Sequence, residues 1–167
     1  MELEHLRLTE TEIVKRVRDF LIAKERGNWH EDLAREAGLR GRGADLILIG
    51  GNRKSEKFIV ECKGKSEAPS AARSSNKEGW IHALGQLVTR MDTPRTIQSG
   101  ANKGMTNHAY KYGLGLPWIA AKVALRRIPR QIAMTLCIHI FSVNDQGVVK
   151  QFTPSQVGQD YPDTAFH

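Results

Sequence analysis

Two short apolar runs that follow each other closely constrain the fold of this chain most. Residues 44–51, ADLILIGG, and residues 57–63, KFIVECK, are separated by the polar segment 51–56. Runs of this length, rich in branched aliphatic residues and bounded by glycine, are typical of buried strands. We therefore predict a β-hairpin, and its continuous apolarity predicts central positions in a sheet.

Helical and strand-like patterns follow each other along the rest of the chain. The first helix has a capping box, with Thr9 at the N-cap and Glu12 three residues later. The expected helices are 9–26, 79–91 and 117–128, with a short helical turn at 30–37, and the expected further strands are 132–143 and 148–152. We expect a mobile loop at 64–78 and a polar, turn-rich stretch at 92–113. This order predicts a single-sheet α/β or α+β domain.

A chain of 167 residues suits one domain. We expect its core at about 9–152 and a polar C-terminal tail at 153–167. No apolar run approaches the ~20 residues that cross a bilayer, so we expect no membrane partner. The opening residues have no apolar segment typical of a secretory signal, and only two cysteines occur. These features favour the reducing cytoplasm, although the sequence does not exclude a disulfide.

The charge of the chain favours an acidic partner. Lysine and arginine number 25 against 18 acids, for a net charge of +7. Such a surplus promotes binding to nucleic acids through release of counterions. The alternative is that the charge is incidental, since many small basic proteins bind nothing acidic.

Two carboxylates and one lysine are expected to meet at the end of the hairpin. Asp45 opens the first strand, and Glu61 and Lys63 end the second. Because strand side chains alternate between faces, Glu61 and Lys63 share a face and Cys62 points to the other. The antiparallel partner can bring Asp45 beside Glu61. Two neighbouring carboxylates repel each other unless a cation lies between them.

A hard divalent cation suits this group. Mg²⁺, or Mn²⁺ in its place, takes oxygen ligands, and Asp45 and Glu61 supply them. The bound cation polarises a phosphodiester and acidifies a water, while Lys63 orients that water or stabilises the growing negative charge. The pattern thus predicts phosphodiester hydrolysis. The alternative is a structural ion pair between Lys63 and either acid, with no metal.

With these residues the sequence resembles the PD-(D/E)xK nuclease superfamily. The motifs of the resemblance cover residues 9–91, and the order of elements extends it to about residue 152. The resemblance implies a restriction-endonuclease-like fold, a central mixed β-sheet flanked by helices. It also implies that Asp45 and Glu61 bind the metal, that Lys63 acts in catalysis, and that DNA is a better substrate than RNA. Many members add a glutamate from the first helix, for which Glu12 matches best and Glu10 second. Ala44 stands where the nominal pattern has proline.

Further residues are candidates for contact with a substrate. Gln86 and Arg90 lie four apart on the helix after the motif, where Gln86 can position the water and Arg90 can hold a phosphate. Some superfamily members carry a glutamine on that helix. The alternative is that Gln86 and Arg90 lie on a solvent-exposed face of the helix and have no role in the site. The expected cationic contacts to the nucleic-acid backbone are Lys65, Arg73, Lys77, Arg90, Lys103 and Lys111.

Two functions of different class therefore remain open. The first is a Mg²⁺-dependent, endonuclease-like enzyme acting on DNA, which can form a homodimer because enzymes that cut both strands often do. The second is a non-catalytic basic module that binds nucleic acid, as part of a larger DNA-processing system. Only the first requires a cation between Asp45 and Glu61.

Overall fold

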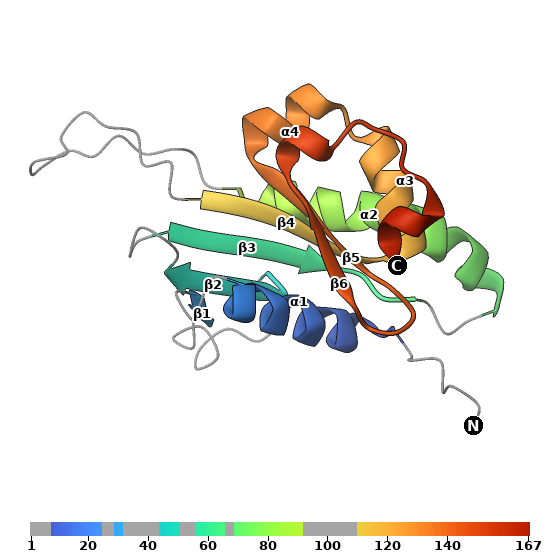
Figure 1. Cartoon of the computed structure of the whole chain (residues 1–167), viewed down its shortest axis with the longest axis horizontal. Helices are drawn as coiled ribbons and strands as arrows, with labels where there is room; N and C mark the ends of the chain where they lie inside the picture. Colours follow the sequence, from blue (N-terminus) through green and yellow to red (C-terminus); the bar gives the residue numbers. More distant parts are fainter. Residues whose placement is uncertain (1–7, 25–28, 32–43, 51–55, 66–68, 92–109) are drawn as a thin grey trace, which may run out of the picture.

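The strands of this protein form one mixed sheet. The computed structural model describes residues 8–24, 29–31, 44–50, 56–65, 69–91 and 110–167, with the backbone alone at His30 and at 69–77. The six strands that it describes lie side by side in chain order (Figure 1). They are β1 (Trp29–Glu31), β2 (Leu46–Gly50), β3 (Glu56–Cys62), β4 (Tyr110–Pro117), β5 (Ile138–Val143) and β6 (Val149–Phe152). The two central pairs, β3–β4 and β4–β5, are parallel, and the outer pairs are antiparallel.

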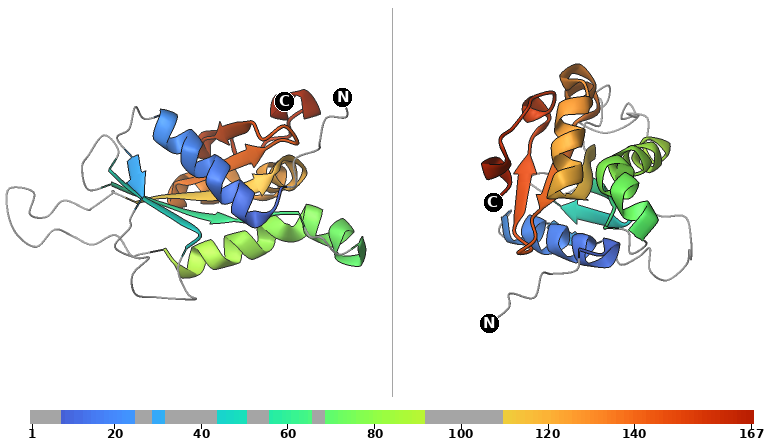
Figure 2. Two further views of the ribbon diagram at one scale, coloured as in Figure 1. Left: turned by 90° about the horizontal axis from the view of Figure 1, so that it is seen from below. Right: turned by 90° about the vertical axis from the view of Figure 1, so that its right-hand side faces the viewer.

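Helices cover both faces of this sheet. The described helices are α1 (Glu10–Lys24), α2 (Pro69–Thr89), α3 (Trp118–Arg127) and α4 (Arg130–Leu136). In the two views of Figure 2, α1 lies across one face, whereas α2 and α3 lie on the other. In chain order α2 lies between β3 and β4, and α3 and α4 lie between β4 and β5, as parallel strands require a crossover connection. The expected mixed sheet flanked by helices is thus present.

Each face of the sheet packs its own apolar core. Ile13, Val17 and Leu21 recur at helical spacing on α1 and are buried against one face. On the opposite face, Ala83 and Leu87 of α2 are buried against β3 and β4 and against α3. Because strand side chains alternate, β3 contributes to both cores. Its residues Phe58, Val60 and Cys62 belong to the α1 side and Ile59 to the α2 side.

Several elements differ from the sequence-based expectations. Residues 69–78, expected in a loop, form the first half of α2. A strand, β1, begins at Trp29 where we expected a helical turn, and residues 32–37 of that turn lie outside the described residues. Residues 110–113, expected in a turn-rich stretch, begin β4, whereas 92–109 are not described.

The apolar run 132–143 was expected to be one strand, and the structure divides it into α4 and β5. Cys137 separates the two elements, with a left-handed φ of 54° that ends the helix. Within α4, Ala133 is buried while Ile132 and Met134 are exposed, so the apolar side chains here do not form a strand face.

The C-terminal tail is more than a polar extension. Val157 and Phe166 are buried in the α2-side core, and short 3₁₀ turns form at Pro154–Gln156 and Asp163–Phe166. The expected core boundary at residue 152 therefore lies too early. Among the described helices, none combines the length and apolarity needed to cross a bilayer.

Candidate active site

Asp45 and Glu61 lie near the same arginine. The β2–β3 register begins with Leu46 opposite Val60, and Asp45 directly precedes β2. Alternation along β3 turns Glu61 away from the α1-side core, which holds Val60 and Cys62, and toward α2. Arg90 pairs with Glu61 and also lowers the pKa of Asp45, so the charge of this arginine acts on both acids.

A hydrogen bond ties Asp45 to the motif strand. The backbone N–H of Cys62 donates to Asp45 Oδ2 at 2.7 Å. Burial raises the pKa of Asp45 above its usual value, more than the Cys62 hydrogen bond lowers it. Among nearby charges, Glu10 raises this pKa, and Lys63 and Arg90 lower it. Asp45 thus lies within the field of all three groups.

Glu61 is fully buried and is paired with an arginine. Its exposed fraction is 0%. Arg90, one residue beyond the end of α2, forms an ion pair with Glu61 Oε1. Both carboxylate oxygens of Glu61 are buried and accept no hydrogen bond from the described residues, so this carboxylate has unused capacity for a further ligand.

Lys63 is paired with Glu10, the first residue of α1. Its Nζ lies 2.9 Å from Glu10 Oε2. Gly64 permits this approach, because a Cβ at that position would lie 2.2 Å from the backbone nitrogen of Glu10. The amide of Lys65 also donates to Leu8 O at 2.8 Å, which fixes the start of α1 against the motif. Among the described ion pairs, Lys63 is thus paired with Glu10 rather than with Glu61 or Asp45, the pairing that was the alternative to a metal site.

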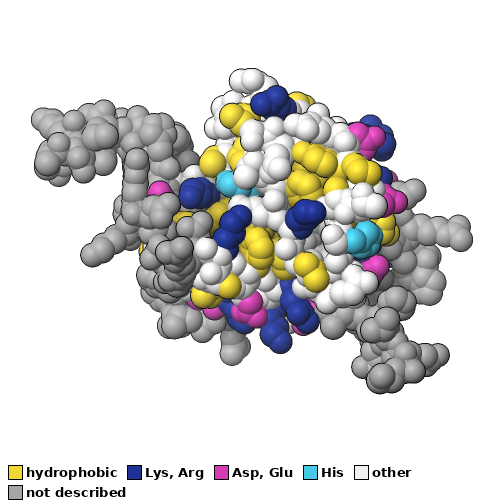
Figure 3. Space-filling model, viewed as in Figure 1, with side chains coloured by type: hydrophobic (Ala, Val, Ile, Leu, Met, Phe, Trp, Pro, Cys, Tyr) yellow, Lys and Arg dark blue, Asp and Glu magenta, His cyan; other side chains and the backbone are white. Residues whose placement is uncertain are grey.

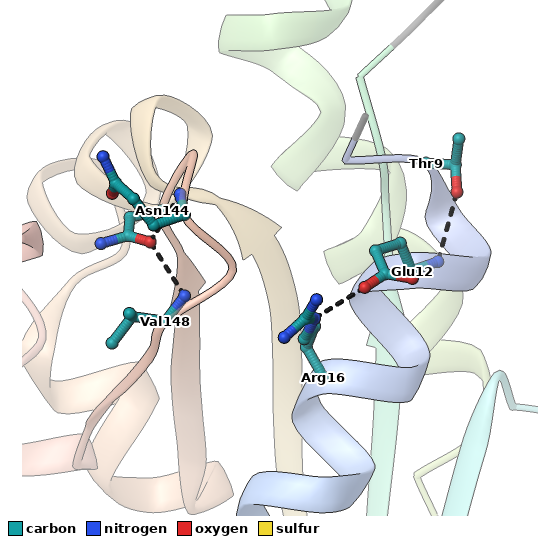
Figure 4. Close-up of polar contacts among 6 residues, drawn as sticks. Thr9, Glu12, Arg16, Asn144 and Val148 are labelled. Atoms are coloured by element: carbon teal, nitrogen blue, oxygen red, sulfur yellow. Dashed lines mark hydrogen bonds and ion pairs between the residues drawn. The ribbon is translucent and has the colours of Figure 1, made fainter. Parts of the chain in front are cut away.

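The two helix glutamates have different surroundings. Glu12, the first choice by resemblance, accepts a hydrogen bond from Arg16 Nε at 2.6 Å, and its backbone N–H donates to Thr9 Oγ1 at 3.2 Å (Figure 4). Glu10, the second choice, is the glutamate beside Lys63. The difference arises because Glu10 begins α1 next to Gly64. Glu12 instead has a same-helix partner four residues further along.

Other expected site residues are distributed over the molecule. Gln86 is exposed on α2 one turn before Arg90. The ammonium of Lys65 pairs with Asp145 at 2.6 Å, an acid that the sequence analysis did not single out.

Lys111 pairs with Glu56 at 3.4 Å near the start of β3 and β4, far along the strands from Lys63. Arg73 and Lys77 belong to α2, but their side chains, like all of Lys103, lie outside the description.

The donor set agrees with a Mg²⁺ site built on two carboxylates. Within the part of the chain that the structure describes, Lys63 pairs with Glu10 and Arg90 pairs with Glu61, and both cations lower the pKa of Asp45. Within the described ranges, no three His, Cys, Asp or Glu side chains are close enough to hold a metal together. Mg²⁺ is commonly bound through one or two carboxylates and keeps several waters. Asp45 and Glu61 are the residues that would hold such an ion, and the two oxygens of Glu61 accept no hydrogen bond from the described residues.

The comparisons with known proteins add no relative. Neither family models, nor curated proteins, nor solved structures gave a match to this chain. The case for a nuclease therefore depends on the residues of the hairpin and on the arrangement that the fold gives them.

Proposed function

We propose that this protein is a metal-dependent nuclease of the PD-(D/E)xK type that hydrolyses phosphodiester bonds in DNA. One observation carries the proposal. Asp45 precedes β2 and accepts the N–H of Cys62 at the end of β3, and Glu61 and Lys63 flank that cysteine in the sequence. Glu61 is buried and Asp45 is half-buried, and burial of an acid without a partner is costly to a fold, which supports a functional reason for both.

In this proposal each residue has a separate task. Asp45 and Glu61 hold Mg²⁺, with Mn²⁺ as an alternative, and the bound cation supplies polarisation of the phosphate and an acidified water. The ammonium of Lys63, held by Glu10 at 2.9 Å, donates to a phosphate oxygen or to the attacking water. Glu10 acts as a positioning residue, because it touches Lys63 and not the reacting atoms.

The choice of DNA depends on charge and on the analogy with the superfamily. A net charge of +7 favours a polyanion. On the face of Figure 3, Lys and Arg side chains lie scattered among apolar ones. Cleavage of both strands would suit a homodimer, and the cytoplasm suits the free thiols of Cys62 and Cys137.

Nicking of a supercoiled plasmid tests the proposal. We expect cleavage with Mg²⁺ or Mn²⁺, none with EDTA, and a loss of about 100-fold or more in Asp45→Asn and Glu61→Gln. Asp163→Asn is a matched control, because Asp163 is an exposed acid paired with Lys122 at 2.6 Å away from the hairpin. Absence of cleavage on duplex, branched and single-stranded DNA, or unchanged cleavage in Glu61→Gln, contradicts the proposal.

A non-catalytic nucleic-acid-binding module is the second candidate. The observation that favours it is the ion pair with Arg90, which neutralises Glu61 without any metal. This candidate predicts salt-sensitive DNA binding that is independent of divalent ions, and Asp45→Ala would then bind as well as the wild type or better. Calorimetric titration with Mn²⁺ separates the two, since only the nuclease takes up the ion.

A further inference from the structure

The partner of Glu61 is the least expected feature of the site. Glu61 is buried, and its neutralising charge comes from Arg90, a residue on another element about thirty positions later in the chain. Lys63, two residues away, is engaged by Glu10 instead. Arg90 therefore already serves the carboxylate that the nuclease proposal assigns to the metal.

A buried carboxylate binds two close cations less favourably than it binds one. In the interior, a guanidinium and a divalent ion on the same carboxylate repel each other strongly, because water screens them poorly. Both oxygens of Glu61 lack a hydrogen bond from the described residues, and an ion that binds either of them lies next to the charge of Arg90. Binding of the ion thus weakens the hold of Glu61 on Arg90.

Arg90 is free to move once that hold weakens. Its side chain is 21% exposed, whereas that of Glu61 is 1% exposed, so the arginine reaches solvent and the glutamate does not. It lies one residue beyond the end of α2, where a change of rotamer need not disturb the helix. A guanidinium released there presents a planar pair of N–H donors that matches a phosphodiester.

We propose that Arg90 exchanges partners: it neutralises Glu61 in the metal-free protein, and it binds the DNA phosphate once a divalent ion occupies Glu61. This inference rests on the proposed function and assigns the order of binding within the site. Metal and DNA then bind cooperatively, because each favours the released arginine. Without metal, the same ion pair keeps the site in an inactive state.

Metal affinity tests the first half of this exchange. Calorimetric titration with Mn²⁺ compares the wild type, Arg90→Gln and the control Arg126→Gln, which removes the same charge from an exposed position on α3. We expect Arg90→Gln to bind Mn²⁺ about tenfold more tightly, within the usual range of coupling between sites. The control should bind as the wild type does. Equal or weaker binding by Arg90→Gln overturns the inference.

DNA affinity tests the second half. Fluorescence anisotropy of a labelled oligonucleotide is measured with EDTA and with Ca²⁺, another cation that takes oxygen ligands. We expect Ca²⁺ to strengthen DNA binding about tenfold in the wild type and in Arg126→Gln, and much less in Arg90→Gln. An equal gain in all three proteins overturns the exchange.

Two further variants keep the test decisive. If Arg90→Gln does not fold, Arg90→Lys retains the charge but loses the planar fork, and at least a twofold tighter Mn²⁺ affinity is expected. Unchanged affinity there counts against the exchange. Uptake of Mn²⁺ that is lost in Glu61→Gln, without any effect at Arg90, refutes only this inference. Absence of Mn²⁺ uptake in every variant refutes the proposed function as well.

Discussion

The backbone N–H of Cys62 donates to the carboxylate of Asp45 across the hairpin, at 2.7 Å. Cys62 lies between Glu61 and Lys63, and its own side chain is buried on the α1 side. Burial raises the pKa of that thiol well above its usual range, which favours a packing role rather than a reactive one. One hydrogen bond therefore ties the acid of one strand to the motif of the next.

Replacement of Asp45 separates its structural and functional roles. Because burial raises the pKa of Asp45, the folded state holds its proton more tightly than the unfolded chain does. The Asp45 carboxyl group therefore contributes stability at low pH, and this contribution is lost as pH rises from the usual aspartate value of about 3.9 through the raised one. At pH 7, Asp45→Asn should raise the Tm in EDTA while abolishing cleavage.

The alanine variant is the counterpart of that experiment. Asn retains an oxygen that accepts the Cys62 N–H, whereas Asp45→Ala leaves this buried donor without a partner. We expect Asp45→Ala to lose about 1–3 kcal/mol in urea unfolding. Equal destabilisation by Asn and Ala would show that burial of the charge is not what opposes folding here.

Gly64 should be intolerant of a side chain. A Cβ there would lie 2.2 Å from Glu10 N and 2.5 Å from Thr9 C, which are backbone atoms that yield only if α1 shifts. Gly64→Ala should therefore cost about 1–3 kcal/mol in urea unfolding. It should also reduce cleavage, since the shift separates Glu10 from Lys63.

Gly85 provides the control for that substitution. A Cβ at this position on α2 meets nothing within 4 Å. Gly85→Ala should stabilise the protein by about 0.5–1 kcal/mol through helix propensity alone. If both alanine variants behave alike, the close approach of α1 to the motif does not constrain the site.

The two glutamates of α1 should differ in their effect on cleavage. Glu10→Gln releases the ammonium of Lys63. We expect the nicking rate of this variant to fall about tenfold, as for the loss of other groups that orient a site residue. Glu12→Gln breaks only a part-exposed pair with Arg16, for which about 0.5 kcal/mol is typical. Its nicking rate should stay within about twofold of wild type. The reverse order would place Glu12 in the site.

The elements that the sequence predicted well are those with a regular apolar pattern. The hairpin β2–β3 and helix α1 form where the continuous apolar runs and the helical spacing predicted them. β4 escaped prediction because Gly113 and Gly115 resemble turn residues. Both are required by tertiary contacts, since a Cβ would lie 2.7 Å from the Phe141 ring and 2.6 Å from Cys62 Sγ, respectively.

The site was predictable in one respect and not in another. Strand alternation predicted that Glu61 and Cys62 point to opposite faces, and Cys62 is buried in the α1-side core while Glu61 pairs with Arg90. The pairings of Lys63 with Glu10 and of Glu61 with Arg90 depend on where α1 and α2 pack against the sheet. No local pattern encodes that packing, so the choice between Glu10 and Glu12 could not be made from spacing alone.

His139 should control the acid stability of the fold. It lies in β5, 5.3 Å from the Phe58 ring centroid, with its Nδ1 2.9 Å from Gln151 Nε2. Burial, followed by the charges of Lys111 and Lys24, lowers its pKa to about 4. The unfolded chain, with a pKa near 6.5, binds the proton first. Stability is therefore full above about pH 6.5 and falls as pH drops toward 4.

Urea unfolding at several pH values measures this loss. A shift of this size corresponds to roughly 2–3 kcal/mol between pH 7.5 and pH 4, added to the changes from the carboxylates. His139→Gln keeps a polar group for Gln151 but does not titrate. Between pH 7.5 and pH 4, the variant should therefore lose roughly 2–3 kcal/mol less stability than the wild type loses. Because burial, Lys111 and Lys24 shift the pKa of His139 and Asp45 is not among these causes, Asp45→Asn should leave the histidine contribution unchanged. Parallel pH profiles for wild type and His139→Gln would show that protonation of this ring is not opposed by the fold.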